Sequence, residues 1–208
     1  MAGSSDIALA FTGASGMPYG LRLLECLLAA GERVALMVSQ PAQVVMAMET
    51  DLRVPAAPRD MAAFFVAHFG ARAEQLRVYG KDQWTAPVAS GSAAPRAMVV
   101  CPCTSGTLAA IANGSSDNLL ERAADVALKE QRKLILVPRE MPLSAIHLEH
   151  MLKLARLGVV IMPACPGFYH RPPDIAGLVD FVVARILDHL DVPHRLLPRW
   201  GEEEADAE

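Results

Sequence analysis

The sequence has little of what marks secreted, membrane or metal-dependent proteins. Its apolar runs stay shorter than the roughly 18 residues that span a bilayer, and its start, MAGSSD, lacks the basic region and apolar core of a signal peptide. It has four cysteines and no C-x-x-C pair, so the pattern indicates neither a disulfide framework nor a thiolate zinc site. We therefore expect a cytoplasmic protein with reduced thiols and no membrane contact.

Charge of either sign is also scarce over most of the chain. The 208 residues include 23 acidic and 19 basic ones, but five of the acidic residues lie in the tail GEEEADAE at 201–208. The rest is close to neutral and has no basic face for nucleic acid. The length predicts one domain, 1–208, in which 201–208 is a frayed acidic tail.

Short apolar runs alternate with segments of helical period along most of the sequence. Strands are predicted at 7–11, 33–39, 97–102, 133–138 and 159–163, and helices at 17–30, 41–49, 61–70, 105–113, 118–130, 143–157 and 174–190. The region 52–96 is less regular, and 85–95 is interpreted as a loop. This alternation predicts a three-layer, Rossmann-like α/β fold with a parallel central sheet covered by helices on both faces. Such sheets bind ligands at the carboxyl ends of their strands.

The turn after the first predicted strand, FTGASGMPYG, has its glycines in a G-x-x-G-x-x-x-G pattern. This pattern matches neither the dinucleotide fingerprint nor the Walker loop. A nucleophile elbow would need glycine in place of Met17. The turn allows a ligand close to the backbone, with Ser15 near a helix N-terminus, although a tight turn without a ligand explains it equally well.

Two other strands end in similar turns. CPCTSGTL places Thr104, Ser105 and Thr107 around Gly106, and Ser39 ends the second strand. Hydroxyl groups at a helix start suit a phosphate, but they also suit simple N-capping. Three such turns on one edge of the sheet favour a phosphorylated ligand.

Cationic side chains indicate a possible second anion site, formed by Lys129, Arg139, Tyr169 and Arg185. Arg139 follows a buried strand, where charge rarely occurs without a purpose. A salt bridge between Lys129 and Asp125, and a snorkelling Arg185, are the structural alternatives. Glu49 and Glu140 add carboxylates. Two phosphate sites would imply transfer between two phosphorylated ligands.

Long segments resemble the UbiX-type flavin prenyltransferases, from about residue 6 to 201. They are TGASGMPYGLRLL, METD, APVASGS, CPCTSGTLAAIANG, ERAADVALKE, LILVPREMPLSAIHLEHMLKLARLGVVIMP, PGFYHRP and PRWGE. The resemblance implies a flavodoxin-like fold in a dodecamer. It also implies metal-independent transfer of a dimethylallyl group from dimethylallyl phosphate to N5 and C6 of reduced FMN. The product, prenylated FMN, would be the cofactor of a partner family, the UbiD-type decarboxylases, which includes an enzyme of ubiquinone synthesis.

The resemblance also implies roles for single residues. The FMN contacts would be Gly13, Ala14, Ser15, Ser39, Thr104, Ser105, Gly106, Thr107, Arg122 and Arg139. The prenyl phosphate would be held by Lys129, Arg139, Tyr169 and Arg185, in a pocket shaped by Trp84 and Trp200. The catalytic group would be Ser15, Glu49 and Glu140.

Two other functions are compatible with this fold class. A flavin-dependent cysteine decarboxylase would have a P-x-M-N-x-x-M-W motif, but the corresponding PACPGFYHRP contains neither Asn nor Trp. A non-catalytic FMN carrier, or an accessory subunit of a decarboxylase, would need only the flavin site. Metal-dependent prenyltransferases carry a D-D-x-x-D motif, and this sequence has no Asp-Asp pair. Lys and Arg would then stabilise the leaving phosphate.

Overall fold

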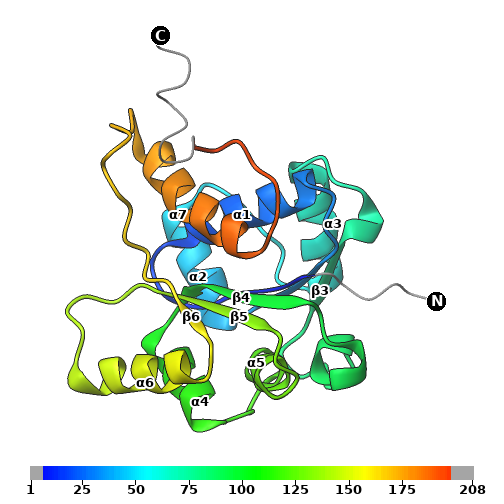
Figure 1. Ribbon diagram of the computed structural model, residues 1–208. Coiled ribbons are helices and arrows are strands. Elements are labelled where there is room, and N and C mark those ends of the chain that lie inside the picture. The colour runs from blue at the N-terminus through cyan, green and yellow to red at the C-terminus, as the bar shows by residue number, and fades with distance from the viewer. Residues whose placement is uncertain (1–6, 198–208) are drawn as a thin grey trace.

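A parallel sheet forms the centre of the computed structural model, which describes residues 7–197 (Figure 1). Its strand order is β3-β2-β1-β4-β5-β6. The strands are β1 (Ile7–Phe11), β2 (Val34–Val38), β3 (Leu76–Tyr79), β4 (Ala97–Cys103), β5 (Lys133–Pro138) and β6 (Val160–Ile161). This is the Rossmann order, and the direction of winding reverses between β1 and β4, the point where such sheets bind ligands.

Helices cover both faces of the sheet (Figure 1). One layer consists of α1 (Met17–Ala29), α2 (Gln40–Glu49), α3 (Pro58–His68) and α7 (Ile175–His189). The other consists of α4 (Ser105–Asn113), α5 (Leu119–Lys129) and α6 (Ala145–Arg156). The predicted three-layer α/β fold is confirmed. None of these described helices has the length and apolar character needed to cross a bilayer.

Both faces of the central strand are buried, as a doubly covered sheet requires. Leu9 and Phe11 of β1 belong to the core beneath α1 and α7, whereas Ala8 and Ala10 belong to the core above α4 and α5. All five residues of β1 are buried. The ends of this strand are therefore fixed in position, and with them the turn that follows it.

Two strands differ from the prediction. β3 was not predicted, because it is a four-residue edge strand whose apolar run is interrupted by the exposed Arg77. β6 is shorter than the predicted 159–163, although the N–H groups of Met162 and Ala164 still donate to carbonyl oxygens of β5. The loop 85–95 contains two short 3₁₀ turns, Pro87–Ala89 and Gly91–Ala93, and another, Ala73–Gln75, precedes β3. Trp200 and the predicted tail lie outside the described residues.

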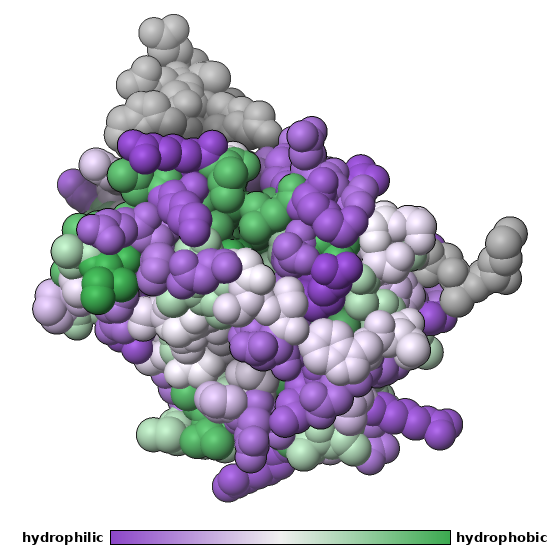
Figure 2. Space-filling model, turned by 90° about the horizontal axis from the view of Figure 1, so that it is seen from below, coloured by the Kyte–Doolittle hydropathy of each residue, from purple (hydrophilic) through white to green (hydrophobic). Residues whose placement is uncertain are grey.

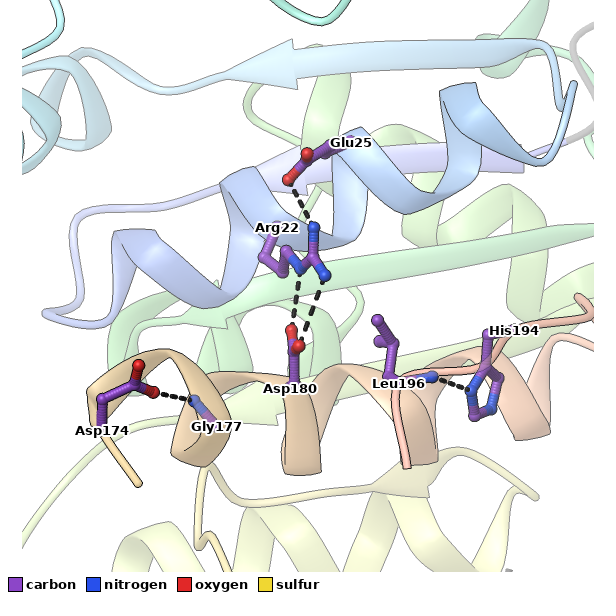
Figure 3. Close-up of polar contacts among 7 residues, drawn as sticks. All are labelled: Arg22, Glu25, Asp174, Gly177, Asp180, His194 and Leu196. Carbon is purple, nitrogen blue, oxygen red and sulfur yellow. Dashed lines mark hydrogen bonds and ion pairs between the residues drawn. The ribbon is translucent and has the colours of Figure 1, made fainter. Parts of the chain in front are cut away.

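Helix α7 is oriented against α1 by an ion pair as well as by apolar packing (Figure 3). The Nε and Nη2 atoms of Arg22 donate to the two carboxylate oxygens of Asp180 at 2.8 and 3.3 Å. Glu25 accepts a third hydrogen bond from the same guanidinium at 2.8 Å. Because the contact with Asp180 has two points, it limits rotation of one helix on the other.

Gly20 lies where α1 passes closest to β1 and β4. A Cβ at this position would lie 2.5 Å from the carbonyl oxygen of Cys101 and 2.9 Å from the ring of Phe11. We expect Gly20→Ala to lower the free energy of unfolding by about 1–3 kcal/mol, the usual cost of overpacking a core. Urea unfolding measures this change.

The matched control is Gly106→Ala, also within a helix. The nearest atom to a Cβ there, Thr104 Oγ1, is 3.9 Å away. This variant should be as stable as the wild type, or more stable by up to about 1 kcal/mol through its better helix propensity. A Gly20→Ala protein of wild-type stability would contradict the close packing.

Candidate active site

A pocket of about 250 Å³ opens at the carboxyl ends of β1, β2 and β3. Hydroxyl side chains from three separate segments line it, those of Thr12, Ser39 and Thr107. Asn118, Lys81, Gln40 and Tyr79 add polar groups to its wall, and Glu121 adds one carboxylate. The pocket lies next to the reversal between β1 and β4, where a sheet of this order is expected to bind its ligand.

The N-termini of α2, α4 and α5 converge on this pocket. Their N-caps are Ser39, Thr104 and Asn118, and each side chain accepts the backbone N–H three residues further on at 3.0–3.2 Å. A helix N-terminus carries the positive end of the macrodipole, so three of them together favour an anion. The pocket thus suits a phosphate group.

The N-terminus of α1 already holds an anion, which belongs to the chain itself. Glu49, at the end of α2, accepts the N–H groups of Gly16 and Met17 at 2.9 and 2.8 Å. The hydroxyl of Ser15 also bonds to this carboxylate. Gly16 has φ of 118°, a left-handed value that other residues rarely adopt. The glycine turn FTGASGMPYG therefore holds the carboxylate of Glu49.

The ionisation of Glu49 follows from these contacts. Burial raises its pKa, but the hydrogen bonds from Ser15 and two backbone N–H groups, with the charge of Arg139, outweigh burial and lower the pKa below the ordinary 4.5. Glu49 is therefore a carboxylate at neutral pH. In that state it can accept a proton but has none to donate.

Arg139 and Glu140 connect the ends of β1, β4 and β5. Arg139 Nε donates to the carbonyl oxygen of Ser15 at 3.1 Å, and the hydroxyl of Ser105 donates to Glu140 at 3.0 Å. The bond from Ser105 lowers the pKa of Glu140, and a backbone N–H and the charge of Arg139 add to this effect. The structure thus brings Ser15, Ser105, Arg139 and Glu140 together, as the sequence predicted.

The other predicted flavin contacts divide into two groups. Gly13 lies so close to α2 that a Cβ would be 2.4 Å from Pro41 Cβ, and Ala14 beside it is buried. Arg122 lies elsewhere, where it donates to the carbonyl oxygen of Ala89 at 3.2 Å and to Asp125 at 2.6 Å. Asp125 is therefore paired with Arg122 and not with Lys129, the alternative considered from the sequence.

The predicted second anion site does not form within one chain. Lys129 ends α5 four residues before β5 begins, whereas Arg139 directly follows β5. The six residues of β5 place its two ends about 20 Å apart. Helical period identifies the face of α5 that bears Lys129, but it does not bring that helix end to the pocket. The interpretation that the strand ends gather all four residues is corrected here.

Arg185 and the aromatic residues are also separate from the pocket. Arg185 pairs with Asp188 at 2.6 Å near the end of α7, and Lys133 at the start of β5 donates to the nearby carbonyl of His189. Arg185 thus lies toward the edge that bears Lys129. Tyr169 and Trp84 are 76% and 47% exposed, so this chain alone does not enclose them. The contact of Tyr169 with a prenyl phosphate and the role of Trp84 in shaping the pocket remain predictions.

Thr12, Tyr79, Lys81 and Asn118 are among the pocket residues that were not predicted from the sequence. Asn118 immediately precedes a predicted helix, so its capping position was a usable signal. Tyr79 ends β3, the strand that the pattern did not reveal, and Lys81 follows it. Thr12 carried no local signal, because its partners are about 90 residues away.

The lowered pKa of Glu49 makes stability depend on pH. A carboxylate with a depressed folded-state pKa stabilises the protein above its ordinary pKa, and this contribution is lost as pH falls through the folded-state pKa. We expect Glu49→Gln to lower the melting temperature at pH 7 and to weaken its decline below about pH 4.5. Thermal unfolding between pH 7 and pH 3 measures both effects.

The exposed Glu149 of α6 provides the control Glu149→Gln, which should change neither the melting temperature at pH 7 nor its decline in acid. Identical curves for wild type and Glu49→Gln would contradict the role of Glu49 in the turn.

Known proteins resemble this chain over nearly its whole length. A family model described as Flavoprotein matches residues 1–187. The flavin prenyltransferase UbiX of Pseudomonas aeruginosa is 60% identical over 98% of this chain and 97% of its own. That of Methanocaldococcus jannaschii is 43% identical over 94% of this chain and 98% of its own.

Solved structures agree with this relationship. AnUbiX in complex with FMN and dimethylallyl pyrophosphate is 39% identical, with a TM-score of 0.83, over 93% of this chain and 96% of its own. A dodecameric FMN-dependent UbiX-like decarboxylase from Escherichia coli O157:H7 is 40% identical, with a TM-score of 0.81, over 93% and 98%. A PPC decarboxylase, 19% identical with a TM-score of 0.57 over 78% and 84%, shares the fold alone. The chain therefore belongs to the Flavoprotein family and, within it, to the UbiX flavin prenyltransferases.

Proposed function

We propose that this chain joins the dimethylallyl group of dimethylallyl phosphate to N5 and C6 of reduced FMN and releases phosphate. The convergence of three helix N-termini on one pocket, beside the group of Ser15, Arg139 and Glu140, carries the proposal. It provides a phosphate site next to groups that can serve acid–base chemistry. The family membership and the FMN-bound relative support the same assignment.

The residues of the pocket fit FMN. The phosphate end would lie at the N-termini of α2, α4 and α5, near Ser39 and Thr107, because Glu49 already occupies the N-terminus of α1. The ring system would then lie toward Ser15 and Arg139. When bound and reduced, FMN supplies the nucleophilic atoms N5 and C6.

Breaking the allylic C–O bond leaves negative charge on the departing phosphate. Fixed cations stabilise this charge, and Arg139 is the described cation at the strand ends next to Ser15. The bond to N5 would form with release of the N5 proton, and closing the ring at C6 would require a proton to be added to the allylic double bond and one to be removed from C6. Glu140, whose pKa is lowered by Ser105, is ionised at neutral pH and can accept a proton, as can the released phosphate.

The phosphate grip of Lys129, Tyr169 and Arg185 would be completed by other copies of the chain. Lys129 lies near the start of β5 and Arg139 follows its end, so a single copy does not bring the two side chains to the same phosphate. Figure 2 shows the face of α4, α5 and α6, where hydrophobic side chains lie at the surface among charged ones. Met141 is 87% exposed and Ile146 62% exposed. We propose a homododecamer, as in the relative from Escherichia coli.

The destination of the product is a further part of the proposal. Prenylated FMN would pass to a UbiD-type decarboxylase, as the family resemblance implies. We also propose that transfer takes place in the cytoplasm. All four cysteines are unpaired, which agrees with a reducing compartment.

The reaction can be tested directly. Anaerobic incubation with reduced FMN and dimethylallyl phosphate should give a species heavier than FMN by one C₅H₈ unit, detected by mass spectrometry. The yield should be the same in EDTA and in added Mg²⁺, because side-chain cations stabilise the leaving group. Dimethylallyl pyrophosphate in a parallel reaction identifies which ester is accepted. Absence of product with either ester would contradict the proposed transfer, and a strict need for Mg²⁺ would contradict its metal independence.

Shared sites can be tested by complementation. Lys129→Ala and Arg139→Ala should each lose activity by about 100-fold or more, as when one transition-state donor is removed. When the two chains are co-expressed, some sites take Lys129 from one copy and Arg139 from another. Product formation should therefore partly return.

The control pair is Arg139→Ala with Glu140→Gln. Arg139 and Glu140 are consecutive in the chain, so each site takes both of them from the same copy. Every site in the mixed protein therefore lacks one of the two wild-type residues. This pair should remain inactive. Recovery by the control pair, or none by the Lys129 and Arg139 pair, would contradict the shared site.

A further inference from the structure

The backbone hydrogen-bond ladder between β1 and β4 ends before the turn 13–16 and before the start of α4. The regular pairing ends at Ala10 and Val100. Two residues later Pro102 has no N–H to donate, although its carbonyl accepts the N–H of Thr12 at 3.3 Å. The two strand ends therefore need another link before the chain turns into α4.

The side chain of Thr12 supplies this link. Its hydroxyl donates to the carbonyl oxygen of Pro102 at 2.7 Å and accepts the N–H of Thr104 at 2.8 Å. Thr12 is 2% exposed, and among the buried residues of the described chain only it and Gln75 are polar. A buried donor or acceptor that loses its partner is destabilising, so replacing the hydroxyl would leave the N–H of Thr104 unsatisfied in its present position.

The contact extends from Thr12 to the pocket in two steps. Thr104 caps α4 by accepting the N–H of Thr107 at 3.0 Å, and the hydroxyls of Thr104 and Thr107 are 2.9 Å apart. Thr107 and Thr12 both line the pocket. Thr12 also directly precedes the turn 13–16. One buried hydroxyl thus connects the turn after β1 to the N-terminus of α4.

We propose that Thr12 is a positioning residue of the flavin site. It fixes the spacing between the turn 13–16 and the start of α4, so that both face FMN without rearrangement. The inference rests on the proposed function, in which FMN occupies this pocket. It assigns to Thr12 a contribution to FMN affinity that comes through Thr104 and Thr107.

The test compares FMN dissociation constants of purified, folded variants. Thr12→Val keeps the shape of the side chain but removes the hydroxyl, and it should weaken FMN binding by about 10-fold to 100-fold, the equivalent of one buried hydrogen bond. Thr12→Ser restores the hydroxyl and should bind within about threefold of wild type. Gln75→Leu is the matched control, because Gln75 bonds to the carbonyl of Leu28 and the N–H of Arg72 instead of the pocket. It should lower the melting temperature and leave FMN affinity unchanged.

Two outcomes would overturn the inference. They are wild-type FMN affinity in Thr12→Val, and an equal loss of affinity in Gln75→Leu. A wild-type protein that does not bind FMN would instead refute the proposed function. If Thr12→Val does not fold, Thr12→Ala, which leaves room for a water on the Thr104 N–H, takes its place with the same expected loss.

Discussion

Helix starts present N–H groups that need acceptors, and this fold places the starts of α1, α2, α4 and α5 at one edge of its sheet. The arrangement follows from the parallel strands, since every crossover returns the chain to the same edge. Ser39, Thr104 and Asn118 satisfy part of this requirement with neutral side chains. Neutral caps do not compensate the positive ends of the dipoles, and only α5 among these three helices has an acidic residue, Glu121, in its first turn, so the edge remains suited to an anion.

Glu49 makes the electrostatic potential at the N-terminus of α1 different from that at the other three helix N-termini. Its carboxylate compensates the dipole of α1 and lies near Arg139, so the positive potential is reduced at the turn after β1. A phosphate carrying up to two negative charges is then favoured at α2, α4 and α5 instead. The same carboxylate holds the turn that carries Ser15. In the proposed function, one long-range contact thus sets both the direction of the flavin and the position of a predicted catalytic hydroxyl.

Local patterns predicted most of the elements but fewer of the contacts. Arg139 and Glu140 were found because a charged pair after a buried strand stands out in any sequence. Glu49 was noted only as an additional carboxylate and its role came from resemblance, because its partners, Gly16 and Met17, are more than 30 residues away. β3 was missed because an exposed arginine breaks its short apolar run. The helical period of α5 predicted which face of the helix bears Lys129. It did not predict at which end of the parallel strands Lys129 lies, because that depends on the direction in which the helix runs along the sheet.

The separation of the cations has a physical reason in the proposed mechanism. Several cations around one phosphate repel one another in the absence of the ligand, which would destabilise a single chain that held them all. Here two of the cations proposed for the prenyl phosphate have a neighbouring carboxylate: Lys129 has Glu130 and Arg185 has Asp188. Such partly exposed pairs contribute at most about 1 kcal/mol each, so a substrate phosphate can replace the carboxylate at small cost. Each chain can therefore fold with these charges balanced, and in the proposed oligomer the excess positive charge would arise where copies meet.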